Sequence, residues 1–234
     1  GGIIGTISSF SETNMTDCSS NGTISTNCSN CAIGGLIGRV QNEPEFYSTN
    51  KDSTLTLENN ICTFDGVTPT AVVGGVIGKI NGTLHLTIQI MGTETSGNIE
   101  SFSSYTESSF VGVGGFIGLV VNNSDLTIEL KECTNKCSIN TNTSKVGGLI
   151  GSVINNKNII NGTTIIFTNT SNLGKIECQH SSNIGGFVGF LFNIQKVQTS
   201  EQCNNSGDIT ITEAQESCSV GGIIGMFTNG MNVV

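Results

Sequence analysis

The chain has 234 residues, of which 31 are glycine and two are proline, with no tryptophan and a formal net charge of −9. This acidic balance repels phosphate backbones and anionic lipid surfaces, so we expect no nucleic acid partner. The 36% hydrophobic content argues against disorder. The longest apolar run, 111–121, is too short to span a bilayer, and nothing at Gly1 resembles a secretion signal. We therefore expect a soluble segment, with any export signal outside it.

A glycine motif of six residues recurs along the whole chain. The copy at 33–38 reads Ile-Gly-Gly-Leu-Ile-Gly, and residues 1–5 form a copy without its leading residue. The first glycines stand at 1, 34, 74, 114, 147, 185 and 221, so the spacing varies from 33 to 40 residues. Such a period predicts a solenoid, a propeller or an array, here as one repeat domain over 1–234. In the six complete copies the motif glycines are Gly34, Gly35, Gly38, Gly74, Gly75, Gly78, Gly114, Gly115, Gly118, Gly147, Gly148, Gly151, Gly185, Gly186, Gly189, Gly221, Gly222 and Gly225.

Two weaker patterns follow each glycine motif. Residues 84–90 and 126–130 alternate apolar and polar side chains, which predicts strands with one wet face. A Gly-x-Ile pattern comes next, as in Gly97 and Ile99, with Cys137 and Gly66 as departures. A cysteine stands four residues before this glycine position at Cys18, Cys62, Cys133 and Cys203. We expect about three short strands per repeat, separated by Asn, Ser and Gly turns.

The glycine motif itself predicts a strand. Its apolar residues also fit a helical stripe, but three glycines in six residues destabilise a helix, and Ile, Val and Phe prefer strands. As a strand it places Gly34, Leu36 and Gly38 on one face and Ile33 and Ile37 on the other. Both faces are apolar, so we expect both to be covered, by another layer of the chain or by a lateral partner.

A column of asparagine follows the motif. Asn42, Asn122, Asn155, Asn193 and Asn229 stand at the same offset, with Gly82 in the remaining copy. Asn and Gly tolerate positive φ, so the column predicts a turn with left-handed backbone. A stacked ladder of amides is the alternative.

These patterns predict an all-β chain folded as a parallel β-solenoid of six to seven repeats. A β-propeller is the alternative, because its blades have similar length. The absence of Trp and of Trp-Asp or Gly-His signatures, and the variable repeat length, favour the solenoid.

The residues also carry a resemblance to a known family. Cys18-x3-Gly22-Thr23-Ile24, followed by the motif at 33–38, resembles the GLUG-motif repeats of large surface proteins, including bacterial adhesins and the non-catalytic regions of immunoglobulin A peptidases. The resemblance covers essentially the whole chain and implies a β-solenoid stalk or adhesive surface without an activity. The Asn-rich, Cys-containing composition departs from typical bacterial copies, and no catalytic motif of those peptidases is present.

Nine cysteines predict an oxidising compartment and structural disulfides, with most cysteines paired. Only Cys28 and Cys31 have the spacing of a zinc knuckle, without a second pair or a nearby histidine, so we expect no metal. Equivalent columns nominate Cys18 with Cys31 and Cys203 with Cys218, and adjacent repeats nominate Cys137 with Cys178.

Asn-x-Ser/Thr sequons predict N-glycosylation in a eukaryotic source, although their number exceeds the chance expectation only modestly. The candidate sites are Asn14, Asn21, Asn27, Asn81, Asn122, Asn142, Asn161, Asn169 and Asn204.

No catalytic constellation is evident, and we expect no cofactor and no enzyme activity. His85 and His180 lie in different repeats, and no nucleophile elbow, metalloprotease helix or phosphate loop is present. Asp125, Glu129 and Glu132 form only a local acidic group.

The expected function is therefore an extracellular or cell-surface structural protein, a β-solenoid building block of a fibre, stalk or filament. The expected partner is a further copy, head-to-tail or lateral, because neither end shows a polar capping unit; a chain cut from a longer protein is the alternative. An adhesin or glycan-binding module, with glycans or other surface proteins as partners, is the main rival, with Tyr47 and Tyr105 as its platforms. A polysaccharide-active β-helix enzyme is the second alternative.

Overall fold

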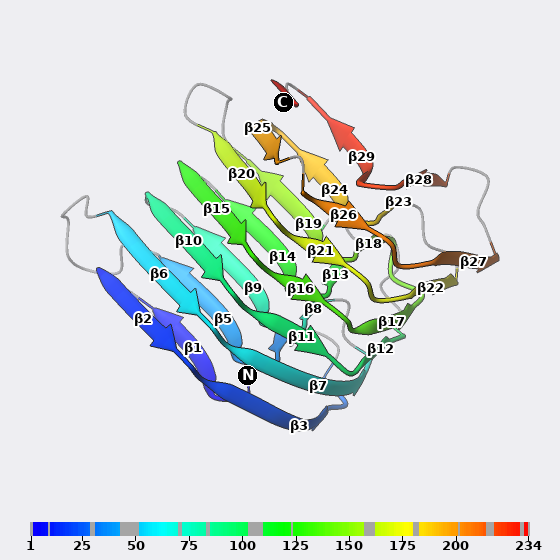
Figure 1. Ribbon diagram of the computed structural model, residues 1–234, viewed down its shortest axis with the longest axis horizontal. Helices are drawn as coiled ribbons and strands as arrows, with labels where there is room; N and C mark the ends of the chain where they lie inside the picture. Colours follow the sequence, from blue (N-terminus) through cyan, green and yellow to red (C-terminus); the bar gives the residue numbers. More distant parts are fainter. Residues whose placement is uncertain are drawn as a thin grey trace.

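The computed structural model is built from parallel β-strands throughout its described residues. These are 2–8, 10–28, 31–42, 52–69, 72–82, 85–102, 110–122, 124–156, 162–179, 183–200, 202–213, 218–229 and 232–233. The strands form four sheets, here called A, B, C and D (Figure 1). Every strand pairs in parallel with its counterpart from a neighbouring coil. No helix occurs in this part of the chain.

The chain visits the sheets in the order A, B, C and D and then begins the next coil. Sheet A contains β1 (Ile4–Ser8), β5 (Ile37–Asn42), β9 (Ile77–Gly82), β14 (Ile117–Asn122), β19 (Ile150–Asn155), β24 (Val188–Phe192) and β29 (Ile224–Thr228). Sheet B contains β2 (Glu12–Thr16), β6 (Ser53–Glu58), β10 (Leu86–Met91), β15 (Leu126–Lys131), β20 (Thr163–Thr168), β25 (Ile194–Thr199) and β30 (Asn232–Val233).

Sheet C is interrupted in most coils, so that two short strands take the place of one. Its strands are β3 (Ser19–Ser25), β7 (Ile61–Thr68), β11 (Glu94–Ser96), β12 (Asn98–Ser101), β16 (Thr134–Asn135), β17 (Ser138–Thr141), β21 (Ser171–Asn172), β22 (Ile176–Gln179), β26 (Asn204–Asn205) and β27 (Ile209–Glu213). Sheet D contains β4 (Ile33–Gly34), β8 (Val72–Gly74), β13 (Gly112–Gly114), β18 (Lys145–Gly147), β23 (Asn183–Gly185) and β28 (Ser219–Gly221).

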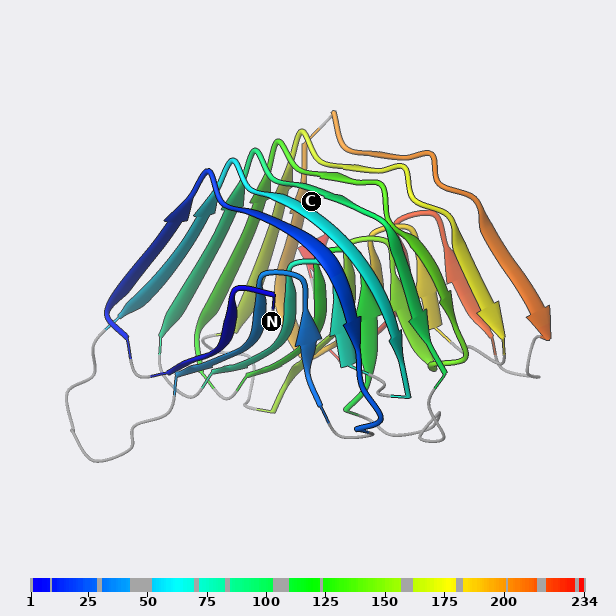
Figure 2. The same ribbon diagram turned by 90° about the horizontal axis from the view of Figure 1, so that it is seen from below.

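This arrangement is a parallel β-solenoid, as predicted, and not a propeller. Sequential strands lie in different sheets, whereas the strands of a propeller blade pair with their neighbours in sequence. In sheet A, Ile37 pairs with Ile4 on one side and Ile77 on the other, so equivalent motif residues stack along the axis. The coils appear as nested arches with the corner between sheets B and C at the top (Figure 2).

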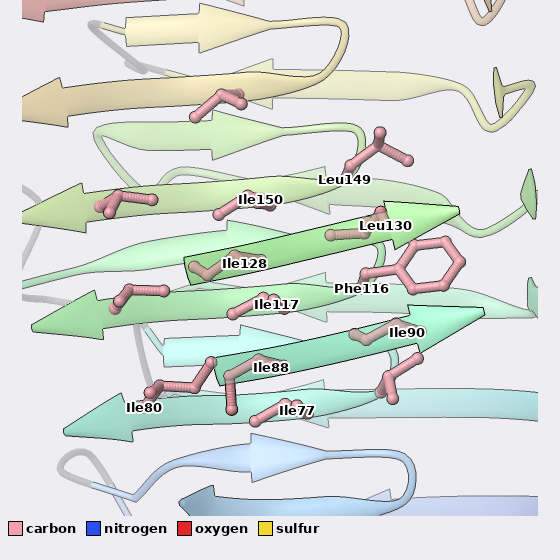
Figure 3. Close-up of a cluster of buried hydrophobic side chains, with 14 of the residues drawn as sticks. Ile77, Ile80, Ile88, Ile90, Phe116, Ile117, Ile128, Leu130, Leu149 and Ile150 are labelled. Carbon is pink, nitrogen blue, oxygen red and sulfur yellow. The ribbon is translucent and has the colours of Figure 1, made fainter. Parts of the chain in front are cut away.

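The core lies between the stacked sheets. Sheet B lies in front of sheet A in Figure 1, and the side chains of Ile88 and Ile90 from β10 point toward Ile77 and Ile80 from β9 (Figure 3). In β10 the burial alternates strictly, so this strand has one buried and one wet face, as its sequence predicted. Sheet A is buried through most of its central strands.

The glycine motif forms a corner rather than one straight strand. In its first complete copy β4 ends at Gly34 and β5 begins at Ile37, with a bend between them. The prediction of one continuous strand with alternating faces is therefore wrong, because the bend at residues 35–36 interrupts it. The prediction that both sides are covered is confirmed, because Ile33 and Ile37 are enclosed by other parts of the chain.

Close backbone approach explains the first glycine of each motif. A methyl group at Gly34 would overlap the Ile37 carbonyl oxygen of its own corner and the Gly78 amide nitrogen of the next coil. The same overlap recurs at Gly114 with the Ile117 carbonyl and the Gly151 amide. None of these glycines needs positive φ, so space and not conformational freedom excludes a side chain.

The asparagine column proves to be mixed. Asn193 and Asn229 have φ of 54° and 60°, as the turn hypothesis requires. Asn122 and Asn155 pair with each other at the ends of β14 and β19 and do not have positive φ. Most left-handed residues instead occupy the corner between sheets B and C, which the sequence reading missed: Asp17, Asn59, Gly92, Glu132 and Asn169.

Replacing Gly114 by Ala tests the packing of the corner. We expect the free energy of unfolding to fall by about 1–3 kcal/mol, because the added carbon overpacks a backbone contact that cannot relax within one coil alone. Thermal or urea unfolding followed by circular dichroism measures the change. Gly22→Ala is the matched control, since no atom lies within 4 Å of the added methyl. Equal losses in the two variants would contradict this account.

Candidate functional site

A buried ladder of polar side chains runs along sheet C, parallel to the solenoid axis. Thr95 Oγ1 donates to Asn135 Oδ1 at 2.7 Å, Asn135 Nδ2 donates to Asn172 Oδ1 at 2.7 Å, and Asn172 Nδ2 donates to Asn205 Oδ1 at 2.8 Å. The side chains come from β11, β16, β21 and β26, which pair in register. Thr95, Asn135 and Asn172 are fully buried, and Asn205 is half-buried. An amide ladder therefore exists, but in another column than the one the sequence suggested.

The ladder explains the second glycine of three motif copies, Gly115, Gly148 and Gly186. A methyl group at Gly115 would overlap the amide of Asn135, and one at Gly148 would overlap the amide of Asn172. In an earlier coil the same position belongs to Cys62, whose sulfur would overlap a methyl at Gly35. The three ladder asparagines, Asn135, Asn172 and Asn205, thus each lie directly on the backbone of a motif glycine. The polar side chains of this part of the interior are thus hydrogen-bonded to one another.

Replacing Asn172 by Ala tests the ladder. Asn135 Nδ2 loses its acceptor and Asn205 Oδ1 loses its donor, so we expect a loss of stability of about 1–3 kcal/mol for each buried group left unpaired. Urea unfolding of the variant measures it. Asn204→Ala is the control, because Asn204 is an exposed neighbour of the ladder. A loss no greater than that of the control would show that the amide bonds are dispensable.

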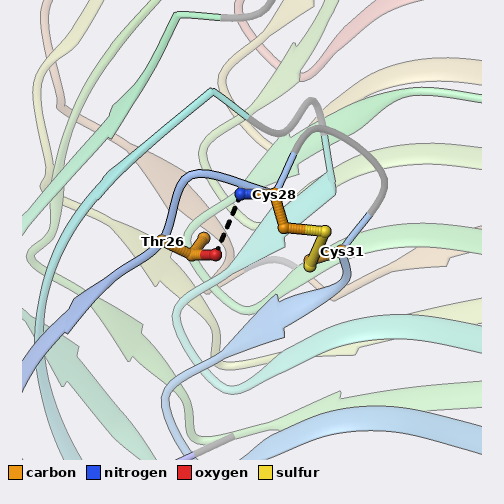
Figure 4. Close-up of a disulfide and its surroundings, with 3 residues drawn as sticks. All are labelled: Thr26, Cys28 and Cys31. Atoms are coloured by element: carbon orange, nitrogen blue, oxygen red, sulfur yellow. Dashed lines mark hydrogen bonds between the residues drawn. A yellow bond between two sulfur atoms is a disulfide. The ribbon is translucent and has the colours of Figure 1, made fainter.

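The structure corrects the predicted disulfides. Cys31 bonds to Cys28 and not to Cys18, with the two Cα atoms 5.7 Å apart, and Cys28 N donates to Thr26 Oγ1 at 3.1 Å (Figure 4). The remaining cysteines are thiols: Cys18, Cys62, Cys133, Cys137, Cys178, Cys203 and Cys218.

Register explains why the other two nominated pairs do not form. Cys178 pairs with Thr141, four residues beyond Cys137 along the neighbouring coil. Four residues of strand span about 13 Å, beyond the reach of a disulfide. Cys203 precedes sheet C and Cys218 precedes sheet D of the same coil, with β27 between them. Equivalent columns in the sequence therefore did not mean neighbouring sulfur atoms.

The buried thiols are protected from reaction. Burial raises the pKa of Cys62, Cys133 and Cys137 to about 12, so these groups stay neutral at physiological pH. Cys62 Sγ donates to the Gly75 carbonyl at 2.8 Å. In the unfolded chain these thiols ionise near pH 9, so their burial costs stability only as the pH rises above that value.

A thiol titration checks this arrangement. In native protein at pH 7.5 we expect an aromatic disulfide reagent to modify only the half-buried Cys18, Cys203 and Cys218. In denaturant without reductant all seven thiols should react, and the disulfide should remain. Fewer than seven thiols in unfolded, freshly purified protein would show additional crosslinks and support the pairing expected from sequence.

The sequons divide by exposure. Asn122 is fully buried and its amide donates to the Ser124 carbonyl, so it cannot carry a glycan in this conformation. Asn81 and Asn142 are half-buried, and Asn161 lies outside the described residues. The remaining candidates have exposed side chains: Asn14, Asn21, Asn27, Asn169 and Asn204.

The histidines and carboxylates that the sequence analysis considered and rejected as catalytic residues lie as follows. His85 Nδ1 lies 3.2 Å from Asp125 Oδ2, next to the start of the central strands β10 and β15. His180 lies outside the described residues. Glu129 accepts a hydrogen bond from Gln89, and Glu132 lies 3.8 Å from Lys131. Among the described residues no group of three or more metal-binding side chains converges. Tyr47 and Tyr105 also fall outside the described residues.

The outward side chains of sheet B form the most regular external surface, here called the sheet-B face. Thr54, Thr87, Thr127 and Thr164 pair in register and make one row of four threonines. The next outward row, two residues along each strand, reads Asn14, Thr56, Gln89, Glu129, Ile166 and Gln198. Sheet C instead carries an outward ion pair, Lys136 to Glu94 at 2.7 Å.

No family model, curated protein or solved structure matches this chain. In the part of the chain that the structure describes, no helix is long and apolar enough to cross a membrane.

Proposed function

We propose that this chain is a structural building block of an extracellular or cell-surface fibre, stalk or filament, as the GLUG-like motif implies. One observation carries the proposal: all four sheets run along the molecule as continuous parallel ladders, with the polar interior closed on itself. A solenoid of this kind transmits load through backbone hydrogen bonds along its axis and needs no concave site. The exposed sequons and the disulfide fit an oxidising, glycosylating compartment.

The last described coil leaves apolar side chains exposed. Val220 in β28 is 51% exposed, although its register partner Ile184 in β23 is fully buried. Phe227 in β29 is 54% exposed beside the buried Leu191. A further coil, from the same polypeptide or another copy, would bury these side chains and complete the sheets.

Electron microscopy of the purified protein tests the proposal. We expect fibres with a repeat of about 4.8 Å per coil along the axis, and Val220→Asp should shorten or abolish them because it places a charge between stacked coils. Val67→Asp is a matched control, since Val67 is 53% exposed but lies on the side of the solenoid, in β7. Isolated particles at all concentrations, or equal effects of both variants, would contradict axial assembly.

A glycan-binding surface is the second candidate, favoured by two exposed aromatic side chains. Phe102 and Phe110 flank residues 103–109 and are 39% and 48% exposed. Aromatic faces of this kind bind sugar rings when they lie together. Specific, competable binding on a glycan array, by protein that forms no fibres, would favour this candidate over the structural one.

A further inference from the structure

The sheet-B face is complementary to itself. Its threonine row is flanked by Glu12, which pairs in register with Thr54, and by Lys196, which pairs with Thr164. The six strands from β2 to β25 thus present one negative residue, four uncharged threonines and one positive residue, and Asn232 of β30 follows Lys196 as the last strand of the sheet. Among the described residues neither Glu12 nor Lys196 has an ion-pair partner.

We propose that two copies of this chain pair face to face through the sheet-B face, around a two-fold axis parallel to the strands and midway between β10 and β15. This inference deepens the proposed function, because it names the lateral contact within such a fibre. Rotation about this axis reverses the order of the coils and keeps each residue's position along its strand. The interface is isologous, so every contact occurs twice.

The rotation pairs opposite charges and polar partners. Glu12 comes to lie opposite Lys196 of the second copy at both ends of the face. Near the axis, Gln89 meets Glu129 of the second copy, which repeats across the interface the hydrogen bond that these residues already make within one chain at 3.3 Å. The row between them brings threonine against threonine, so its small side chains let the two sheets approach to about 10 Å.

The residues at the start of the strands of this face are also complementary in charge. His85 and Asp125 lie side by side at the start of β10 and β15, with Leu86 N donating to the Asp125 carbonyl. The rotation places each of them opposite the other residue of the second copy. Two histidines and two aspartates then alternate at this edge, so that no carboxylate faces another carboxylate.

Other two-fold placements bring like charges together. A two-fold axis parallel to the solenoid axis places Asp52 opposite Glu58 of the second copy. These two residues lie at opposite ends of β6, and this rotation reverses the strand direction. An axis centred on β15 places Glu129 against itself, and one centred on β10 places Asp52 opposite Asp125. Juxtaposed like charges disfavour a docking mode, so the axis between β10 and β15 is favoured over these three placements.

The size of the face fits a specific but weak contact. Six strands spaced about 4.8 Å apart and about six residues long give a face of about 570 Å², or about 1,150 Å² for both copies. Stable protein interfaces begin near this size, so we expect a dissociation constant in the micromolar range.

Asn14 lies on the face beside Glu12, with Nδ2 donating to Glu12 Oε1 at 3.0 Å. A glycan on Asn14 would therefore block the contact.

Charge exchange tests the pairing. In sedimentation equilibrium of unglycosylated protein at low salt, we expect a monomer–dimer equilibrium, and Lys196→Glu should raise its dissociation constant about tenfold or more because glutamate then faces Glu12 twice. Glu12→Lys should do the same. The double variant that exchanges the two charges should recover the original value to within about threefold. Lys136→Glu makes the same charge change on sheet C and should leave the dimer unaffected.

The following results would contradict or support the face-to-face pairing. A monomer at all concentrations, or a double variant as weak as the single ones, overturns the proposed pairing. Growth beyond dimers that responds to Val220→Asp and not to Lys196→Glu shows association through the coil ends instead, which leaves the proposed fibre intact and the lateral contact refuted. A charge-dependent dimer that forms no fibres under any condition supports the face-to-face pairing and contradicts the proposed fibre. Circular dichroism of each variant confirms that the solenoid is folded.

Discussion

The structure depends on how closely two backbones can pass at the glycine corner. Sheet D turns into sheet A within two residues, and the ladder side chain of sheet C lies directly on this turn. At Gly148 the carbonyl of Gly186 in the next coil and the amide of Asn172 both occupy the space of a side chain. Because the contact reaches into the neighbouring coil, each corner fixes the position of the next one, and the whole stack keeps its register.

That fixed register allows the repeats to differ in length. Three residues separate β14 from β15 in the sequence, whereas ten separate β5 from β6. Added residues are accommodated between strands while the paired positions in the sheets remain aligned, as with Ile77, Ile117 and Ile150. Loop length changes the free energy of a fold only slowly, so a solenoid tolerates such variation as long as its corners are intact. The unequal spacing of the glycine motifs therefore argues for a stack of coils held at their corners.

The sequence was sufficient for the repeat, the solenoid and the half-buried strands, because periodicity along the chain records burial directly. The bend inside the motif could not be predicted, since the atoms that exclude a side chain at Gly34 belong partly to the next coil. The ladder did have a local signal: Asn135, Asn172 and Asn205 each stand four residues before an isoleucine of the Gly-x-Ile column. The more frequent asparagines after the motif obscured it, and only the pairing of β16, β21 and β26 separates the two columns.

One coil shows how offsets in sequence mislead. Gly66 was aligned with Gly22, yet it pairs with Ile24 and Ile99 in the isoleucine column. The ring of Phe64 covers the place where the missing isoleucine side chain would lie, so the aromatic residue fills the core from two positions away. The same offset made Cys62 look equivalent to Cys18, although it pairs with Ser20. Aligning the repeats by residue type therefore misplaced Gly66, because the core space at its position is filled by the Phe64 ring.

The inward-facing and outward-facing rows of sheet B differ in how uniform their residues are from one coil to the next. The inner row of β6, β10 and β15 holds Leu55, Ile88 and Ile128, which are interchangeable core residues. One strand position away, the outer row keeps threonine through four successive coils, although solvent would accept almost any polar residue there. Buried rows repeat because packing requires it, and the outer threonines suit a half-buried strand surface on which neighbouring threonines pair favourably. The proposed pairing adds a reason for the opposite charges beside this row, because a second sheet with the same spacing between strands would meet the positions from Glu12 to Lys196 at once.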